Sequence, residues 1–218
     1  MSATPRLWTF RSSPFAGKAR AAFAEKGVAV ELVEIHPAKR PARLKELNPV
    51  NRVPVLELPD EGVAIRESSI ICEWLEETHP DPPLWPADPA QRGWARGWAK
   101  LVDDTVIADF FLGMRKLAFG KDPEDPDDVV ERLHGRLARH WPRIETALAL
   151  HEGPWLCGEQ FTFADLAALP AAVRLPDWAP QLQPDAEAAP LTTAWLEALR
   201  ARPSAAAIDE AGGERLSA

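Results

Sequence analysis

A proline-rich stretch near the middle of the chain separates two halves with different hydrophobic patterns. Residues 79–90 read HPDPPLWPADPA and contain five prolines, which predicts a stiff linker. Before this stretch, short alternating apolar runs are interspersed with helical runs, whereas after it the apolar residues recur at helical spacing. The pattern therefore predicts an α/β domain over residues 1–80, a linker over 81–90 and an all-α domain over 91–218.

In the first half, the order of elements is predicted to be β-α-β followed by β-β-α, which corresponds to a small mixed sheet with helices. The expected strands cover residues 6–10, 30–35, 53–58 and 62–65, and the expected helices cover 15–26, 40–47 and 67–77. Ser13, Pro14 and Gly27 are the residue types expected at the start and the end of the first helix.

The second half is predicted to be helical throughout. The expected helices cover residues 91–119, 129–150, 163–174 and 191–201. Pro142 is expected to kink the second of these helices, and Thr162 with Asp165 predicts a capping box at the start of the third. We expect the tail after Pro203 to be loose.

The composition excludes several classes of partner. There are 33 acidic and 25 basic residues, and the resulting net charge of −8 argues against nucleic acid or an anionic membrane surface. No apolar run approaches the ~18–20 residues that a membrane span requires, and no signal peptide is visible, so we expect a cytoplasmic protein. Cys72 and Cys157 belong to no metal-ligand cluster, and no metal is expected.

A proline lies inside an apolar strand-like run, where it cannot donate a hydrogen bond to the sheet. A cis Val53-Pro54 bond, which costs only about 0.5–1 kcal/mol, would resolve this conflict. Such a bond would turn the backbone groups of Val53 outward, where they could pair with a peptide-like ligand. The alternative is an edge strand with a trans proline and no ligand.

The segment before the helix at 67–77 has the residue types that bind an amino-acid zwitterion. Exposed N–H groups and the helix dipole favour a carboxylate, and the Ser68 hydroxyl adds a donor. Glu67 supplies an anion for an α-ammonium group. The alternative is an ordinary helix cap without a ligand.

The helix predicted over residues 15–26 is preceded by two serines, Ser12 and Ser13, directly before Pro14. A hydroxyl at a helix N-terminus can donate a hydrogen bond to a thiolate, while the dipole stabilises the charge. The alternative is a serine that only caps the helix. The sequence shows no Ser-His-Asp arrangement and no glycine-rich phosphate loop.

These motifs together resemble a known family. The segments Leu47-Asn-Pro-Val-Asn-Arg-Val-Pro-Val-Leu56 and Ile65-Arg-Glu-Ser-Ser-Ile-Ile71 are similar to the glutathione-binding core of cytosolic glutathione S-transferases. Ser13-Pro-Phe-x-x-Lys-x-Arg20 resembles the serine-type start of the tau class and of many bacterial members. The resemblance implies a thioredoxin-like N-terminal domain, an all-α C-terminal domain, glutathione as cosubstrate and a homodimer.

The resemblance also implies roles for individual residues. Ser13 corresponds to the serine that activates the thiol, and Ser12 takes that role if the register is theta- or zeta-like. The glutathione-binding positions are Arg40, Arg52, Val53, Pro54, Glu67 and Ser68. The two arginines correspond to basic residues near the glycine carboxylate, although they could also form a solvated basic face.

The expected activity is addition of glutathione to a small apolar electrophile. The candidates for the acceptor site are Phe15, Phe110, Phe111 and Met114. Because the chain has no tyrosine, tyrosine-type activation is excluded, and neither cysteine lies at a predicted ligand-binding end. Two alternatives stay open: a transferase-like protein that binds a ligand or a protein without turnover, and a zeta-like glutathione-dependent isomerase.

Overall fold

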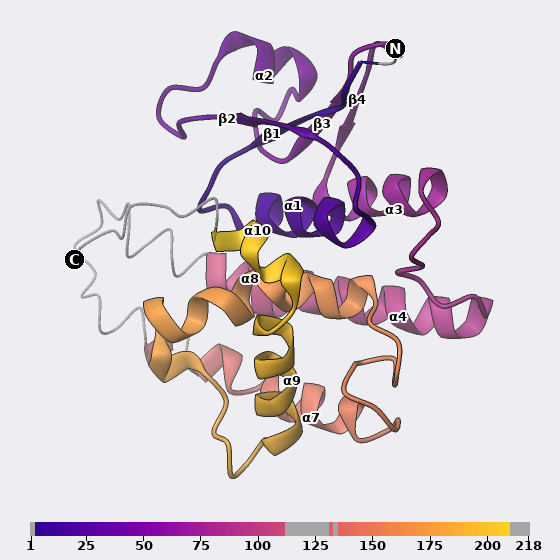
Figure 1. Ribbon diagram of the computed structural model, residues 1–218. Helices are drawn as coiled ribbons and strands as arrows, with labels where there is room; N and C mark the ends of the chain where they lie inside the picture. The colour runs from indigo at the N-terminus through magenta and orange to yellow at the C-terminus, as the bar shows by residue number, and fades with distance from the viewer. Residues whose placement is uncertain (1–2, 112–130, 133–134, 210–218) are drawn as a thin grey trace. The chain divides into compact units, whose positions relative to one another are not determined.

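The computed structural model describes residues 3–111, 131–132 and 135–209 of the 218-residue chain. The described residues form two compact units (Figure 1). One unit holds the sheet and contains residues 3–83 together with 206–209, and the other is helical and lies within residues 84–205. We call them the sheet unit and the helical unit.

The sheet unit is built on four short strands in the order β2-β1-β3-β4. The strands are β1 (Arg6–Thr9), β2 (Glu31–Glu34), β3 (Val55–Leu58) and β4 (Val63–Arg66). β1 pairs with β2 in parallel, whereas β3 is antiparallel to both β1 and β4. The mixed sheet predicted from the sequence is therefore confirmed.

Helices cover both faces of this sheet (Figure 1). α1 (Pro14–Lys26) and α3 (Ser68–Thr78) pack together on one face, and α2 (Ala42–Leu47) lies on the other. The first helix begins and ends as predicted, because the Ser13 side chain accepts from the Ala16 amide at 3.2 Å and Gly27 adopts φ 62°. A left-handed residue at this position ends the helix at little cost when it is glycine.

The chain segment after Pro203 is not loose as far as it is described. It forms a 3-10 turn, η3 (Pro203–Ala205), and a short helix, α10 (Ala206–Asp209). α10 packs against α1, and Ile208 is fully buried. Local sequence did not indicate this segment because its order comes from contacts with a helix nearly 190 positions earlier in the chain, and the expectation of a loose tail is wrong through residue 209.

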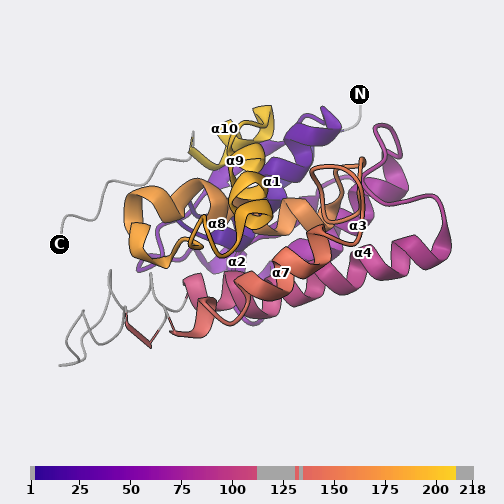
Figure 2. The same cartoon turned by 90° about the horizontal axis from the view of Figure 1, so that it is seen from below.

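The helical unit is arranged around α8 (Phe163–Trp178), which is buried along most of its length. α8 lies between α4 (Pro89–Val102) and α9 (Pro190–Arg200), and α9 also packs against α7 (Trp141–Leu148) (Figure 2). α4 continues into a π-helical turn, η1 (Asp103–Ile107), and a 3-10 turn, η2 (Pro180–Leu182), follows α8.

The predicted capping box at the start of α8 is present. The Thr162 hydroxyl accepts from the Ala164 amide at 3.2 Å, and the Asp165 carboxylate accepts from the Thr162 amide at 2.9 Å. Asp165 is fully buried and also accepts from the Leu156 amide and from the Trp195 indole, each at 2.9 Å. One carboxylate therefore connects the helix start to a preceding loop and to α9.

The helix predicted over residues 129–150 differs in the structure. A turn at 138–140 interrupts it, and α7 begins only at Trp141. Pro142 consequently lies in the first turn of a new helix, where its missing N–H leaves no hydrogen bond unmade. The helix predicted over 91–119 can be followed to residue 111, and its remainder lies outside the described residues.

Candidate active site

The register of the strands brings the three predicted site segments to one end of the sheet. Trp8, the next-to-last residue of β1, and Arg66, the last residue of β4, both pair with Val55, the first residue of β3. The segments at 10–13, 53–54 and 67–68 are the direct continuations of these three strand ends. They therefore meet at this end of the sheet, although they are up to 58 positions apart in the sequence.

The serine loop, residues 9–13, runs from the end of β1 into α1. The Ser13 amide donates to the Phe10 carbonyl at 2.9 Å, and its hydroxyl oxygen accepts from the Ala16 amide. Accepting this bond leaves the hydroxyl hydrogen available as a donor. Ser13 is buried and Ser12 is half-buried. The cap and the predicted thiolate contact are thus compatible in one side chain.

The Val53-Pro54 peptide bond is cis, as the sequence analysis predicts. Pro54 is buried, and the sheet ladder begins at the next residue, Val55. Pro54 therefore lies outside the hydrogen-bonded part of β3, and its lack of an N–H group removes no hydrogen bond from this central strand. Val53 is half-buried and precedes the ladder.

Glu67 adopts an unusual backbone conformation directly before α3. Its φ of 69° lies in the left-handed region, which a residue with a side chain rarely occupies without strain. Such residues concentrate at functional sites. Glu67 is exposed, whereas Ser68 is buried at the first position of α3. The Lys18 ammonium group donates to the Ser69 hydroxyl at 3.0 Å and so joins α1 to this helix start.

The two candidate arginines both belong to the loop region around α2 and are exposed. The Arg40 guanidinium donates to the carbonyls of Pro37, at 3.1 Å, and Asn51. The Arg52 carbonyl accepts from the buried Asn48 side chain at 2.9 Å. The sequence analysis did not single out Asn48, although an Asn-Pro pair is a turn signal that could have indicated its structural role.

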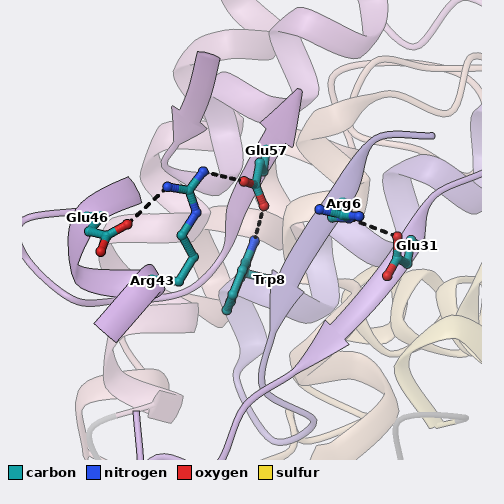
Figure 3. A network of polar contacts seen from close by, with 6 residues as sticks. All are labelled: Arg6, Trp8, Glu31, Arg43, Glu46 and Glu57. Atoms are coloured by element: carbon teal, nitrogen blue, oxygen red, sulfur yellow. Dashed lines mark hydrogen bonds and ion pairs between the residues drawn. The ribbon is translucent and has the colours of Figure 1, made fainter. Parts of the chain in front are cut away.

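A polar network fixes α2 on the sheet (Figure 3). The Glu57 carboxylate on β3 is buried and accepts from the Trp8 indole at 2.9 Å and from the Arg43 guanidinium at 2.6 Å. Arg43 also pairs with Glu46 at 3.0 Å. α2 has only six residues and no side-chain cap, so this network and the fully buried Leu44 hold it in place.

Burial opposes the charge on Glu57, but its hydrogen bonds outweigh the burial. Desolvation acts to raise the pKa of Glu57, whereas the bonds from Arg43 and Trp8 lower it, and the result lies below the ordinary value of 4.5. The stabilisation from this charge is therefore present above the ordinary pKa. It is lost as the pH falls through the lowered folded-state pKa.

Replacing Glu57 with glutamine is expected to reduce the free energy of unfolding at pH 7 by about 1–2 kcal/mol, since a charge-assisted bond is weakened. The difference from the wild-type protein should shrink as the pH falls below 4.5, because wild-type Glu57 then also loses its charge. Urea unfolding at a series of pH values measures both quantities. Glu31→Gln is the matched control, and we expect a smaller change in the free energy of unfolding, because the ion pair of Glu31 with Arg6 is half exposed. A difference that grows with falling pH would contradict this account.

The aromatic candidates for the acceptor site lie in different environments. Phe15 is a half-buried residue of α1 in the sheet unit. Phe110 is 2% exposed in the helical unit, where its ring stacks on Trp178 with centroids 6.2 Å apart. Phe111 is half-buried, and Met114 lies outside the described residues. The acceptor assignments of all four therefore stay predictions.

The described part of the chain holds no group of three or more His, Cys, Asp or Glu residues arranged to bind a metal ion. Cys72 is buried, and burial raises the pKa of the Cys157 thiol to about 11. Among the described helices, none combines the length and the apolar character that a membrane span requires.

Sequence comparison assigns both halves of the chain. The family model described as glutathione S-transferase, N-terminal domain, matches residues 7–83, and the corresponding C-terminal domain matches residues 107–203. The chain belongs to the glutathione S-transferase family. This membership confirms the thioredoxin-like N-terminal domain and the helical C-terminal domain that the resemblance implied, and it identifies the protein as an enzyme.

Individual relatives of this transferase differ in their named activities. A probable maleylacetoacetate isomerase of Caenorhabditis elegans is 32% identical over 76% of this chain and 76% of its own length. A probable glutathione S-transferase of Nicotiana tabacum is 34% identical over 75% of this chain and 67% of its own. A glutathione S-transferase of Methylobacterium radiotolerans in complex with glutathione sulfonate is 34% identical, with a TM-score of 0.72, and the alignment covers 94% and 93% of the two chains.

Proposed function

We propose that this transferase binds glutathione at the end of the sheet where the three site segments meet. It then adds the thiolate of glutathione to a small apolar electrophile. The observation that carries the proposal is the strand register, which brings the serine loop, the cis proline and the Glu67-Ser68 helix start together. These segments supply a hydroxyl donor, free backbone edges and a zwitterion site, as a tripeptide thiol requires.

Each part of glutathione has a proposed partner. The Val53 backbone pairs with the cysteinyl unit and Pro54 shapes that edge. Glu67 binds the α-ammonium group, while Ser68 and the N-terminus of the eleven-residue α3 bind the adjacent carboxylate. Arg40 and Arg52 are the proposed partners of the glycine carboxylate. The exposure of Glu67 and its unusual backbone conformation support this assignment, because backbone conformations of this kind cluster at active sites and ligand clamps.

In the proposed mechanism, Ser13 donates a hydrogen bond to the glutathione thiolate. A serine hydroxyl is too weak a base to remove the proton, so it acts by stabilising the ionised thiol. The N-terminus of α1 favours the same charge. Ser12 is the alternative donor if the register is theta- or zeta-like. The thiolate then attacks the electrophile, for which Phe15, Phe110, Phe111 and Met114 are the proposed apolar contacts.

An isomerase is the second candidate function, because one relative is named as a probable maleylacetoacetate isomerase. In that reaction the thiolate would add to a conjugated double bond and leave again after rotation, so glutathione would be regenerated. Assays of glutathione consumption with aryl halides, epoxides and enones, beside an assay of maleylacetoacetate isomerisation, separate the two. Turnover without net loss of glutathione would favour the isomerase.

Replacing Glu67 with alanine is expected to weaken glutathione binding about tenfold, because the ammonium group of the ligand loses a charged partner. Isothermal titration calorimetry measures the affinity. The matched control is Glu61→Ala, since Glu61 is also an exposed acid of the sheet unit but lies in the turn between β3 and β4. Unchanged affinity in the Glu67 variant would show that the amino-acid end of glutathione binds elsewhere.

We also propose that the enzyme is a cytoplasmic homodimer. The described part of the sheet unit exposes several large apolar side chains, among them Val50 at 63% and Ile70 at 54%, which a second copy could cover. Sedimentation equilibrium of the wild-type protein and of Ile70→Ser tests the oligomeric state. A wild-type protein that sediments as a monomer would contradict the proposal.

A further inference from the structure

A buried arginine in the middle of α1 joins three separate segments of the sheet unit. Arg20 is 4% exposed. Its Nη1 donates to the Thr9 hydroxyl, its Nη2 donates to the Arg11 carbonyl at 3.1 Å, and its Nε donates to the Ala207 carbonyl at 3.1 Å. One guanidinium group therefore joins α1 to two residues of the serine loop and to the helix α10.

Two of these three acceptors belong to the serine loop. Thr9 is the fully buried first residue of the loop, and Arg11 lies directly before Ser12. Between them, the Phe10 carbonyl accepts from the Ser13 amide at 2.9 Å. The backbone that leads to the Ser13 hydroxyl is thus fixed by Arg20 on one side and by the start of α1 on the other.

The third acceptor makes the arrangement depend on the C-terminal segment. α10 is described over Ala206–Asp209, it packs against α1, and its Ile208 side chain is fully buried. The guanidinium group is planar and its donors form a rigid fork. A bond at Nε to Ala207 therefore restricts the directions in which Nη1 and Nη2 can donate.

We propose that Arg20 is a positioning residue for thiol activation, and that α10 acts on the serine loop through it. The inference rests on the proposed role of Ser13. When α10 is displaced, the fork of Arg20 loses its bond at Nε, the Arg11 carbonyl shifts, and the Ser13 hydroxyl moves away from the thiolate. The bound thiol is then less acidic, and the enzyme needs a higher pH to reach the same rate.

Positioning can be separated from the charge of Arg20. A cation near the thiolate would favour ionisation by its field alone, and lysine retains that cation. Lysine cannot reproduce the three-way fork, however. Arg20→Lys therefore removes the positioning and keeps the charge. Ile208→Ala is expected to remove the same positioning in a different way, because it weakens the packing of α10 on α1 and leaves Arg20 itself unchanged.

The test compares the pH dependence of kcat and the KM for glutathione in wild-type enzyme and three variants. For Arg20→Lys and Ile208→Ala we expect a rise of about one unit in the apparent pKa of the bound thiol. At a pH below the pKa, each unit of rise in the pKa lowers the thiolate fraction about tenfold. We therefore expect kcat at pH 6.5 to drop about tenfold. The KM for glutathione should change less than about twofold, because the proposed partners of its two carboxylates and its ammonium group are untouched.

Lys26→Met serves as the matched control. Lys26 is another buried cation of α1, but it donates to Glu76 and to the Pro82 carbonyl at the far end of the helix. Its loss weakens the packing of α1 without touching the serine loop. We expect a lower unfolding temperature and an unchanged pH profile in this variant. If Arg20→Lys does not fold, Ile208→Ala alone decides the question.

The double variant Ser13→Ala with Arg20→Lys distinguishes the possible failures. If Arg20 acts through Ser13, adding Arg20→Lys to Ser13→Ala should shift the profile no further. A wild-type profile in both Arg20→Lys and Ile208→Ala, or an equal Arg20→Lys shift with and without Ser13, would overturn the inference alone. A wild-type profile in Ser13→Ala would instead overturn the proposed role of Ser13, and the inference with it.

Discussion

Replacing Ser13 with alanine is expected to lower turnover about tenfold or more at neutral pH. A free thiol has a pKa near 8.5, so only a few per cent of it is ionised at pH 7. A hydroxyl that donates to the thiolate and the N-terminus of α1 together lower this pKa by about 1–2 units in the proposed mechanism. Alanine removes the hydroxyl and leaves the helix, so the pH profile of kcat should move upward while glutathione affinity changes less.

The helix start itself complicates this experiment, because the Ser13 oxygen also accepts from the Ala16 amide. Loss of a cap costs about 1 kcal/mol of stability. Ser13→Gly is a useful companion, since glycine caps almost as well and yet has no hydroxyl. If both variants shift the pH profile equally, the effect belongs to the thiolate contact. Ser12→Ala should be the milder change, and a larger shift in that variant would make Ser12 the activating residue.

Replacing Asp165 with alanine is expected to reduce the free energy of unfolding by about 3 kcal/mol or more. The carboxylate accepts from the amides of Leu156 and Thr162 and from the Trp195 indole, and all of these donors would be left buried without an acceptor. Each unsatisfied buried donor costs about 1–3 kcal/mol, although relaxation of the loop recovers a part. Urea denaturation of the two proteins measures the difference.

Asp185→Ala is the matched control for this prediction. Asp185 also accepts from a backbone amide, that of Glu187 at 2.9 Å, but it lies in an exposed turn. Water can replace the acceptor there, so we expect a change within about 0.5 kcal/mol. Equal effects in the two variants would show that Asp165 contributes no more than a surface turn does.

The features that the sequence predicted well are those with short-range causes. Ser13, Gly27 and the pair Thr162 with Asp165 act within a few residues of their own positions, so the starts and ends of helices could be read from residue types. Pro54 was also informative, because a proline in a strand-like run has few ways to be accommodated. The sequence therefore indicates each of the three predicted site segments separately, but not their proximity in space.

The features that the sequence did not reveal depend on distant partners. Glu57 occupies a strand as one polar residue among apolar ones, and nothing local indicates that Trp8 and Arg43 satisfy its carboxylate. Arg20 sits in an ordinary helical pattern, while its acceptors lie 9, 11 and 187 positions away. The interruption before α7 likewise leaves no clear local signal beyond Pro142, which fits both a kink and a helix start.

The discontinuity of the sheet unit has a consequence for synthesis of the chain on the ribosome. Domains generally fold as units during translation, the N-terminal one first. Here a nascent chain that has reached residue 205 contains the four strands of the sheet together with Ser12 and Ser13. It does not yet contain the Ala207 carbonyl or the Ile208 side chain, so Arg20 lacks its bond to α10. The proposed site, whose residues are made early, therefore gains this bond only after α10 has been made.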